Sequence, residues 1–270
     1  MTIDTPRNIE RPVHSREPFP RSKMLFLYPL PLLVFVIVWQ VYTMTDPQRQ
    51  FIFSSPHQVW CAFIRLAGNG ELFRNSCVTL VEALAGFTLG TTCGAAIGLS
   101  LWYSRLVSTV SKPYITALGS IPIFALAPMI IAWFGIGIVS KVALAFLSTV
   151  VVAIVQSYQG AMTVEPKFFR LMQVFGANRV QTFKTVVLPS SLIWVVNAMK
   201  LNIGLALLGA FIGEFISAEQ GLGHMIVRAS GLYDMATVIV GVITLAALAL
   251  GLSWLIEQFE RKLLPWRTSD

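Results

Sequence analysis

Charged residues are scarce in this sequence. Asp, Glu, Lys and Arg make up 12% of its 270 residues, about half the share found in soluble domains, whereas 55% of the residues are hydrophobic. A soluble helical protein would interrupt its apolar stretches with polar residues every turn or two. Long stretches of this chain carry no charge at all, so the sequence indicates a membrane protein.

The sequence also lacks the motifs that would mark an enzyme or a metal site. It has no G-x-x-x-x-G-K-[ST] phosphate loop, so it cannot bind ATP in the usual P-loop manner, and it has no H-E-x-x-H zinc motif. Its three histidines lie far apart, and Cys61, Cys77 and Cys93 form neither a zinc pattern nor a disulfide framework. We therefore expect no catalytic residues, no metal and no cofactor in this chain.

Six apolar segments are long enough to cross a membrane, since a helix needs about 20 residues to span a hydrocarbon core of about 30 Å. We expect an all-α membrane protein with six transmembrane helices within residues 24–256, flanked by polar tails at 1–23 and 257–270. The predicted spans are 25–43, 78–104, 113–135, 141–160, 188–212 and 236–256. A basic start before an apolar run can also mark a signal peptide, but no small-x-small cleavage pattern follows it, which favours a retained first helix.

Lys and Arg are unevenly divided between the two sides that these spans define. Fourteen of the twenty lie before the first span, between the second and third, between the fourth and fifth, or after the sixth. Because basic residues accumulate in cytoplasmic loops, we expect both termini in the cytoplasm. This asymmetry accounts for the net charge of +7, and no zinc-type cluster or basic helix indicates binding to nucleic acid.

The connection between the fourth and fifth predicted spans, residues 165–187, has the pattern of two short helices. Glu165 and a following proline suit a helix start, and Gly176 suits the left-handed conformation that ends a helix. Between them an apolar stripe recurs at helical spacing, and it consists of Phe168, Phe169, Met172 and Phe175. From these residues alone two interpretations remain open: an amphipathic segment at the bilayer surface, and a helix that docks into a groove on a soluble partner.

Several motifs resemble those of one family of bacterial membrane proteins. Gly176-Ala177 followed by Val187-Leu188-Pro189 is similar to the cytoplasmic loop of ABC-importer permeases, although Arg170-Leu171-Met172 stands where that loop has Glu-Ala-Ala. Residues 121–128, which read Ile-Pro-Ile-Phe-Ala-Leu-Ala-Pro, and residues 214–223 are similar to segments of the nitrate/sulfonate/taurine branch. The chain thus resembles the binding-protein-dependent ABC-importer permeases of that branch.

The resemblance implies a type I ABC-importer permease architecture in a bacterial inner (cytoplasmic) membrane. The implied partners are a second copy of the chain, two cytoplasmic ATPases that hold ATP and Mg, and an extracytoplasmic solute-binding protein. The family's substrates are mostly small anions such as nitrate, taurine and sulfonates. Residues 165–187 would couple ATPase closure to the spans, through Glu165, Phe168, Phe169, Arg170, Leu171, Met172, Phe175, Gly176 and Ala177. An ion-driven secondary transporter and a membrane scaffold or receptor without transport remain alternatives.

A second group of candidate residues lies within or beside the predicted spans. Its prolines should kink the third span and free backbone groups, which is tolerated beside a cavity or packed protein. Lys200 is costly inside a span, by about 3 kcal/mol at the centre, so we expect it either to pair with Glu82 or Glu214 or to attract an anionic substrate. The candidates for a translocation path are Glu82, Pro122, Pro128, Trp133, Lys200 and Glu214. Glycines at every fourth position over residues 86–98 predict a close helix contact.

Overall fold

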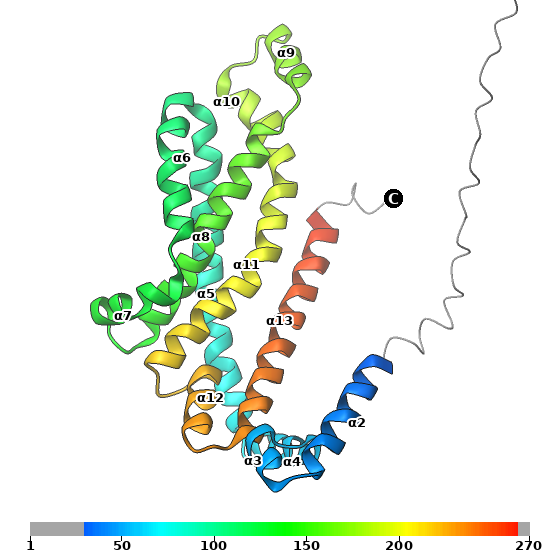
Figure 1. Cartoon of the computed structure of the whole chain (residues 1–270). Helices are drawn as coiled ribbons and strands as arrows, with labels where there is room; N and C mark the ends of the chain where they lie inside the picture. The colour runs from blue at the N-terminus through cyan, green and yellow to red at the C-terminus, as the bar shows by residue number, and fades with distance from the viewer. Residues whose placement is uncertain (1–29, 264–270) are drawn as a thin grey trace, which may run out of the picture.

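The structure is a computed structural model that describes residues 30–263. All regular elements in this range are helices, as Figure 1 shows. In chain order they are α2 (Leu30–Met44), α3 (Pro47–Phe53), α4 (Pro56–Gly68), α5 (Glu71–Ser100), η1 (Leu101–Tyr103), α6 (Arg105–Ser120), α7 (Ile123–Phe134), α8 (Ile138–Met162), α9 (Pro166–Val174), α10 (Arg179–Thr182), η2 (Phe183–Val187), α11 (Leu188–Ile216), α12 (Leu222–Gly231) and α13 (Met235–Leu263). The all-α prediction is confirmed, whereas the predicted tail 1–23, the start of the first predicted span and residues 264–270 lie outside the described residues.

Four helical segments are long and apolar enough to cross a membrane: Glu71–Tyr103, Ile138–Met162, Arg179–Ile216 and Met235–Leu263. α6 and α7 pass the same test together, but they meet at a bend of 90° and form either one broken span or a re-entrant loop. α2 is shorter, with 15 residues in the described range. The described residues therefore support four spans, or five with the bent pair, and do not by themselves establish the six that the sequence predicts.

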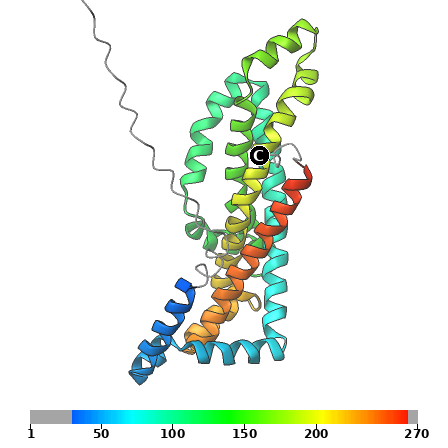
Figure 2. The ribbon, with the colours of Figure 1, turned by 90° about the vertical axis from the view of Figure 1, so that its right-hand side faces the viewer.

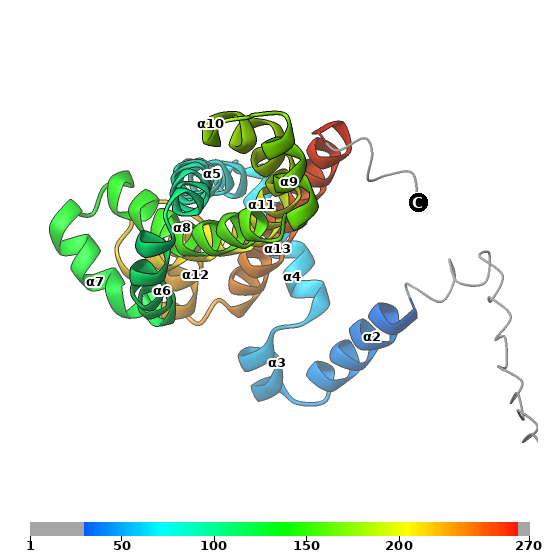
Figure 3. The same ribbon diagram turned by 90° about the horizontal axis from the view of Figure 1, so that it is seen from above.

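The bend between α6 and α7 falls at one of the prolines expected to kink the third span. Ile121 and Pro122 both have extended backbone, with ψ of 122° and 121°. A residue before proline is biased away from the helical region, so the chain leaves α6 there. The second candidate, Pro128, lies inside α7. As a result α7 projects from the side of the bundle instead of continuing α6 (Figure 1, Figure 3).

α5, α8 and α11 form the closely packed centre of the bundle. A Cβ atom added to Gly90 of α5 would lie 2.9 Å from the carbonyl oxygen of Phe146 in α8. Gly209 of α11 meets α8 as closely, since an added Cβ atom would lie 2.7 Å from Cα of Ala145. Small residues let helices approach closely in lipid, where packing replaces the hydrophobic driving force. The glycine spacing in the sequence thus marks a helix contact.

Different short helices lie at the two ends of this bundle. α9 and α10 lie at one end, and α3, α4 and α12 lie at the other (Figure 1, Figure 2). α2 leads away from the bundle at an angle, which is clearest from above (Figure 3). The long helices therefore connect two ends with different shapes and different chemistry.

Candidate functional site

α9 is held as a short helix by the residues at its ends. A proline occupies its first position, and the N–H of Phe168 donates to the carbonyl oxygen of Glu165 at 3.1 Å. At the other end Gly176 adopts a φ of 66°, and the N–H of Ala177 donates back to the carbonyl oxygen of Met172 at 2.9 Å. Glycine takes this left-handed conformation without a Cβ clash, so it ends α9 as the sequence predicts.

The side chains of α9 divide into an exposed apolar face and a face turned toward the bundle. The exposed apolar face, whose side chains are between 40% and 83% exposed, consists of Phe168, Leu171, Val174 and Phe175. Arg170 is also exposed. Phe169 and Met172 are half-buried. The apolar stripe read from the sequence is therefore divided by burial, and only Phe168 and Phe175 of its four members are exposed.

An aromatic cluster fastens this loop to the end of α5. The ring of Phe169 stacks on Trp102 with centroids 6.2 Å apart, and Phe183 lies 5.7 Å from Trp102 and 5.0 Å from Tyr103. Nη1 of Arg179 also donates to the carbonyl oxygen of Tyr103 at 3.3 Å. Aromatic pairs in this distance range stabilise contacts beyond their buried area. The loop and α5 are thus joined by side chains from both.

Two residues of this region were not among the sequence candidates. Val174 has the largest exposed fraction among the hydrophobic residues of α9, 83%, and its signal was its spacing of three residues after Leu171. Trp102 joins the loop to α5, and its signal was an aromatic pair directly after an uncharged helical segment. Both signals are weak in a sequence rich in apolar residues, because many residues have the same spacing. Only the packing of the helices shows which of them are exposed.

The second group of charges is buried near the other end of the bundle. Glu82 and Glu214 are 4% and 1% exposed, and their carboxyl groups interact directly. Lys141, at the start of the fourth predicted span, is 2% exposed in α8 and donates to the carbonyl oxygens of Ile136 and Gly137. Within residues 30–263 no three His, Cys, Asp or Glu side chains are grouped so that they could hold a metal ion. The cluster thus consists of Glu82, Glu214 and Lys141, and Oε2 of Glu82 has no hydrogen-bond partner within the described residues.

Polar side chains of α5 and α11 hold the start of α12. Oε1 of Glu214 accepts from the Thr79 hydroxyl at 2.6 Å, and Oε2 accepts from the N–H of Gly223 at 2.6 Å. The N–H of Leu222 donates to Oγ1 of Thr79 at 2.9 Å, and the N–H of Gly221 donates to Oδ1 of Asn75 at 3.0 Å. The first N–H groups of a helix lack intrahelical partners, so these side chains satisfy them in a buried place.

Lys200 does not join this cluster. Its Nζ lies 2.5 Å from Oε2 of Glu260 in α13, and the predicted pairing with Glu82 or Glu214 is wrong. Lys200 and Glu214 belong to the same helix, 14 residues apart, which places them about 21 Å apart along the axis at 1.5 Å per residue. The ion pair instead joins α11 to α13.

The remaining candidates for a translocation path lie on α7. Pro122 immediately precedes the helix and Pro128 lies within it, whereas Trp133 near its end is 68% exposed. α7 packs on α8 and α11 through a small apolar cluster that includes Ala127 and Leu144. The structure thus keeps these residues on one element and does not bring them to Lys200. Their role in a path remains a prediction.

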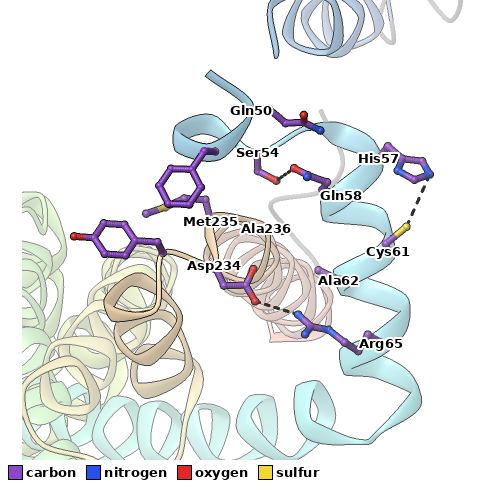
Figure 4. A pocket seen from close by; sticks show the side chains of 12 residues that line it. Gln50, Ser54, His57, Gln58, Cys61, Ala62, Arg65, Asp234, Met235 and Ala236 are labelled. Carbon is purple, nitrogen blue, oxygen red and sulfur yellow. Dashed lines mark hydrogen bonds and ion pairs between the residues drawn. The ribbon is translucent and has the colours of Figure 1, made fainter. Parts of the chain in front are cut away.

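A hollow of about 450 Å³ lies between α3, α4 and the turn before α13, and Figure 4 shows it. Nη2 of Arg65 lies 3.1 Å from Oδ2 of Asp234 and donates to Oγ1 of Thr237 at 3.0 Å, while the Thr237 hydroxyl donates to Asp234 at 2.8 Å. Burial raises the pKa of Asp234, but the hydrogen bonds from Thr237 and the charge of Arg65 outweigh it and hold that pKa below its ordinary value. These three residues join α4 to α13.

Known proteins share this architecture. The chain is similar to a subunit in an inward-facing structure of the MetNI methionine ABC transporter, with 18% identity, a TM-score of 0.64, and coverage of 72% of this chain and 96% of that one. It is also similar to a chain of a bacterial ABC transporter involved in import of the acidic polysaccharide alginate, with 17% identity, a TM-score of 0.60, and coverage of 93% and 97%. At these identities the likeness concerns the fold alone, which is that of ABC-importer permeases.

Sequence relatives cover almost the same length. The chain is 32% identical over 241 residues to the riboflavin transport system permease protein RibX of Chloroflexus aurantiacus, covering 89% of this chain and 90% of the relative. It is 28% identical to the putative aliphatic sulfonates transport permease protein SsuC of Bacillus subtilis (87% and 86% covered), and 25% identical to the taurine transport system permease protein TauC of Escherichia coli (96% and 97%). Residues 86–265 match the model of the binding-protein-dependent transport system inner membrane component. The resemblance read from the sequence is confirmed: the chain belongs to this family, the ABC-importer permease subunits, which are not enzymes and depend on a separate ATPase subunit.

Proposed function

We propose that α9 is the helix through which a cytoplasmic ATPase acts on this permease subunit. The observation that carries the proposal is the exposed apolar face of α9, formed by Phe168, Leu171, Val174 and Phe175. Burying one such side chain is worth roughly 1.5–3 kcal/mol, so four of them at the tip of a loop favour a covering partner. A groove on a soluble protein that accepts a short amphipathic helix would cover them.

The attachment of the loop supports a coupling role. Phe169 stacks on Trp102 at the end of α5, so a displacement of α9 is passed to α5. On the other side of the loop, α10 continues through η2 into α11 without a break. α5 and α11 also carry the buried Glu82 and Glu214 at the far end. Closure of an ATPase dimer would thereby shift the spans between two states that differ in affinity for solute.

The proposed assembly has two copies of this chain, one docking helix for each of two ATPases that hold ATP and Mg. Six spans are proposed for each copy, with residues 25–43 as the first. Both termini lie in the cytoplasm of a bacterium, and the complex lies in the inner membrane. The basic residues near α9 support this orientation: they are Arg105, Lys112, Lys167, Arg170, Arg179 and Lys184. An extracytoplasmic binding protein would deliver solute to the opposite end.

The proposed solute is a small anion of the taurine or sulfonate type. Two relatives carry names that refer to aliphatic sulfonates and taurine, which supports this class, while others are named for riboflavin and formylaminopyrimidine. Lys200 is paired with Glu260, so the proposal of an anion rests on the relatives and not on that lysine. Competition of taurine, an alkanesulfonate and riboflavin for uptake would separate these classes.

The coupling proposal is tested by Leu171→Asp in the assembled transporter. A carboxylate on the apolar face should weaken docking, so we expect the ATPase that co-purifies with the permease to fall at least tenfold. Hydrolysis stimulated by the binding protein should be lost with it. Val180→Asp in α10 is the matched control, because Val180 and Leu171 are 51% and 50% exposed. Equal co-purification with both variants would contradict the docking role of α9.

Two rival functions give different results in sealed vesicles. An ion-driven secondary transporter would move solute with an ion gradient and no nucleotide, whereas the proposed importer needs ATP on the side of α9. A scaffold or receptor would bind its partners without any accumulation of solute. ATP-dependent uptake that requires the binding protein is the expected result.

A further inference from the structure

A cavity of about 690 Å³ lies beneath the loop helices, between the end of α5, the start of α6 and the end of α8. The hydroxyl of Ser108 in its wall donates to the Tyr158 oxygen at 2.5 Å. Among the described residues, no Asp or Glu lines this cavity. Its polar side chains from α6, α8, α9 and α10 include Ser104 (the N-cap of α6), Arg105, Ser108, Tyr158, Gln173, Arg179 and Thr182. Hydroxyl and guanidinium donors without a carboxylate suit an anion with several oxygen atoms.

Two arginines supply the positive charge of this cavity. Within residues 30–263, neither Arg105 nor Arg179 forms an ion pair with a carboxylate, and the guanidinium of Arg179 donates only to the Tyr103 carbonyl oxygen. Lys112 does not line the cavity, but its Nζ lies 5.6 Å from the centroid of the Tyr158 ring, which does. A guanidinium group presents five N–H donors in a planar fork that matches phosphate oxygens. The charge and the geometry of the donors both favour a phosphate group.

The cavity lies at the level where membrane spans end. One span ends at Tyr103, the next ends at Met162, and another begins at Arg179. Trp102 and Tyr103 line the cavity, and such aromatic residues are typical of the lipid headgroup level. From this level an exposed apolar stripe runs along α6 at a spacing of four residues, through Leu106, Val110 and Tyr114. The stripe would accompany acyl chains into the bilayer.

We infer that this cavity binds the phosphate of an anionic phospholipid, with Arg105 and Arg179 as its ligands and α6 beside its acyl chains. A soluble phosphate would contact the same two arginines but not the apolar stripe on α6. A phospholipid would use both, and for this reason we favour the lipid. Basic pockets between spans on the cytoplasmic side bind such headgroups in other membrane proteins. Since the walls come from η1, α6, α8 and the loop, a bound headgroup would tie the loop to three other helical segments. The inference is distinct from docking by α9, because its ligand is a lipid and its two arginines lie outside the exposed apolar face, although Phe169 and Gln173 of α9 line the same cavity.

The test is a titration of the purified, delipidated transporter complex with phosphatidylglycerol, followed by native mass spectrometry. Each arginine is expected to contribute about fivefold to headgroup affinity, so Arg105→Gln combined with Arg179→Gln should weaken binding roughly 25-fold. Arg261→Gln combined with Lys262→Gln is the matched control, since it removes two exposed charges from the end of α13. The control should bind phosphatidylglycerol as the wild type does. Equal affinity of the two double variants would overturn the inference.

A second pair of measurements separates the sources of phosphate and does not depend on the variants. In the wild-type complex, glycerol phosphate and inorganic phosphate should fail to displace phosphatidylglycerol at millimolar concentration. Displacement by either one would show that the cavity binds a soluble anion and would overturn the inference of a lipid site. A photoreactive phosphatidylglycerol should label residues 101–114 and 158–182, and labelling confined to other segments would also overturn it.

Discussion

Buried charges in this bundle are stabilised by backbone groups as well as by side chains. Lys141 donates to carbonyl oxygens of the turn that precedes α8, and Glu214 accepts from the N–H of Gly223 at the start of α12. A buried ionisable group is costly unless hydrogen bonds replace the water that it loses. The turn before α8 and the start of α12 therefore have their conformations fixed partly by single charged residues.

The conformation of Gly176 leads to a prediction about a single residue. Its φ of 66° is costly for any residue with a Cβ atom, by about 1–2 kcal/mol, and more for a β-branched one. Gly176→Val should therefore distort the end of α9 and lower the solute moved per ATP hydrolysed, while hydrolysis itself continues. Gly251→Val in α13 is the control, because Gly251 is exposed, helical and has no atom within 4 Å of an added Cβ. An unchanged ratio of solute to ATP in Gly176→Val would refute the role of this turn.

Asp234 carries a prediction about pH. The pKa of Asp234 is lower in the folded protein than in the unfolded chain, where it is about 4, so the carboxylate stabilises the fold at a pH above 4. This stabilisation is lost as the pH falls through the lower pKa of the folded protein. Asp234→Asn should thus lower the unfolding temperature at pH 7, and the difference from wild type should shrink toward pH 3. A difference that stays constant with pH would show that the charge of Asp234 does not act this way.

One hydroxyl group contributes two hydrogen bonds to the contact between α5, α11 and α12. Oγ1 of Thr79 donates to Glu214 and accepts from the N–H of Leu222, and all three groups are buried. Thr79→Val would leave a buried carboxylate oxygen and a buried N–H without these partners, at a cost of about 1–3 kcal/mol for each group. We expect a clear loss of thermal stability in detergent. The Thr88→Val control should be nearly neutral, because Thr88 is exposed and bonds only to its own helix at the Leu84 carbonyl.

Local chemistry explains which elements the sequence could predict. Uncharged stretches near 20 residues indicated helices, and Gly176 marked the end of α9, because both signals depend on a few neighbouring residues. The partner of Lys200 could not be predicted, since it depends on how α13 packs beside α11. The exclusion of Glu214 as that partner was available from helix geometry alone. The division of the stripe on α9 depended on Trp102, which lies more than 60 residues earlier in the chain.

At the scale of the whole molecule, two ends with different chemistry imply two different environments. The end with α9 carries exposed apolar residues and, within residues 30–263, most of the basic residues, which suits the proposed cytoplasmic partner. At the end with α3, α4 and α12, an ion pair and hydrogen bonds join Arg65, Asp234 and Thr237 beside a hollow. Cys61 lies at this second end and is exposed, so a native thiol reports which side it faces.

The orientation predicts the labelling of this thiol. In a variant with Cys77→Ser and Cys93→Ser, a membrane-impermeant maleimide added to spheroplasts should react with Cys61, because the proposed orientation places its end outside. When Cys61→Ser is added and Thr163→Cys is placed at the exposed end of α8, labelling should require that the membrane first be opened. Each variant is the control for the other, because the same maleimide is added to both and only the side of the membrane that the cysteine faces should differ. The reverse pattern would place α9 outside, where no ATP is available, and would remove the coupling role together with the predicted cytoplasmic termini.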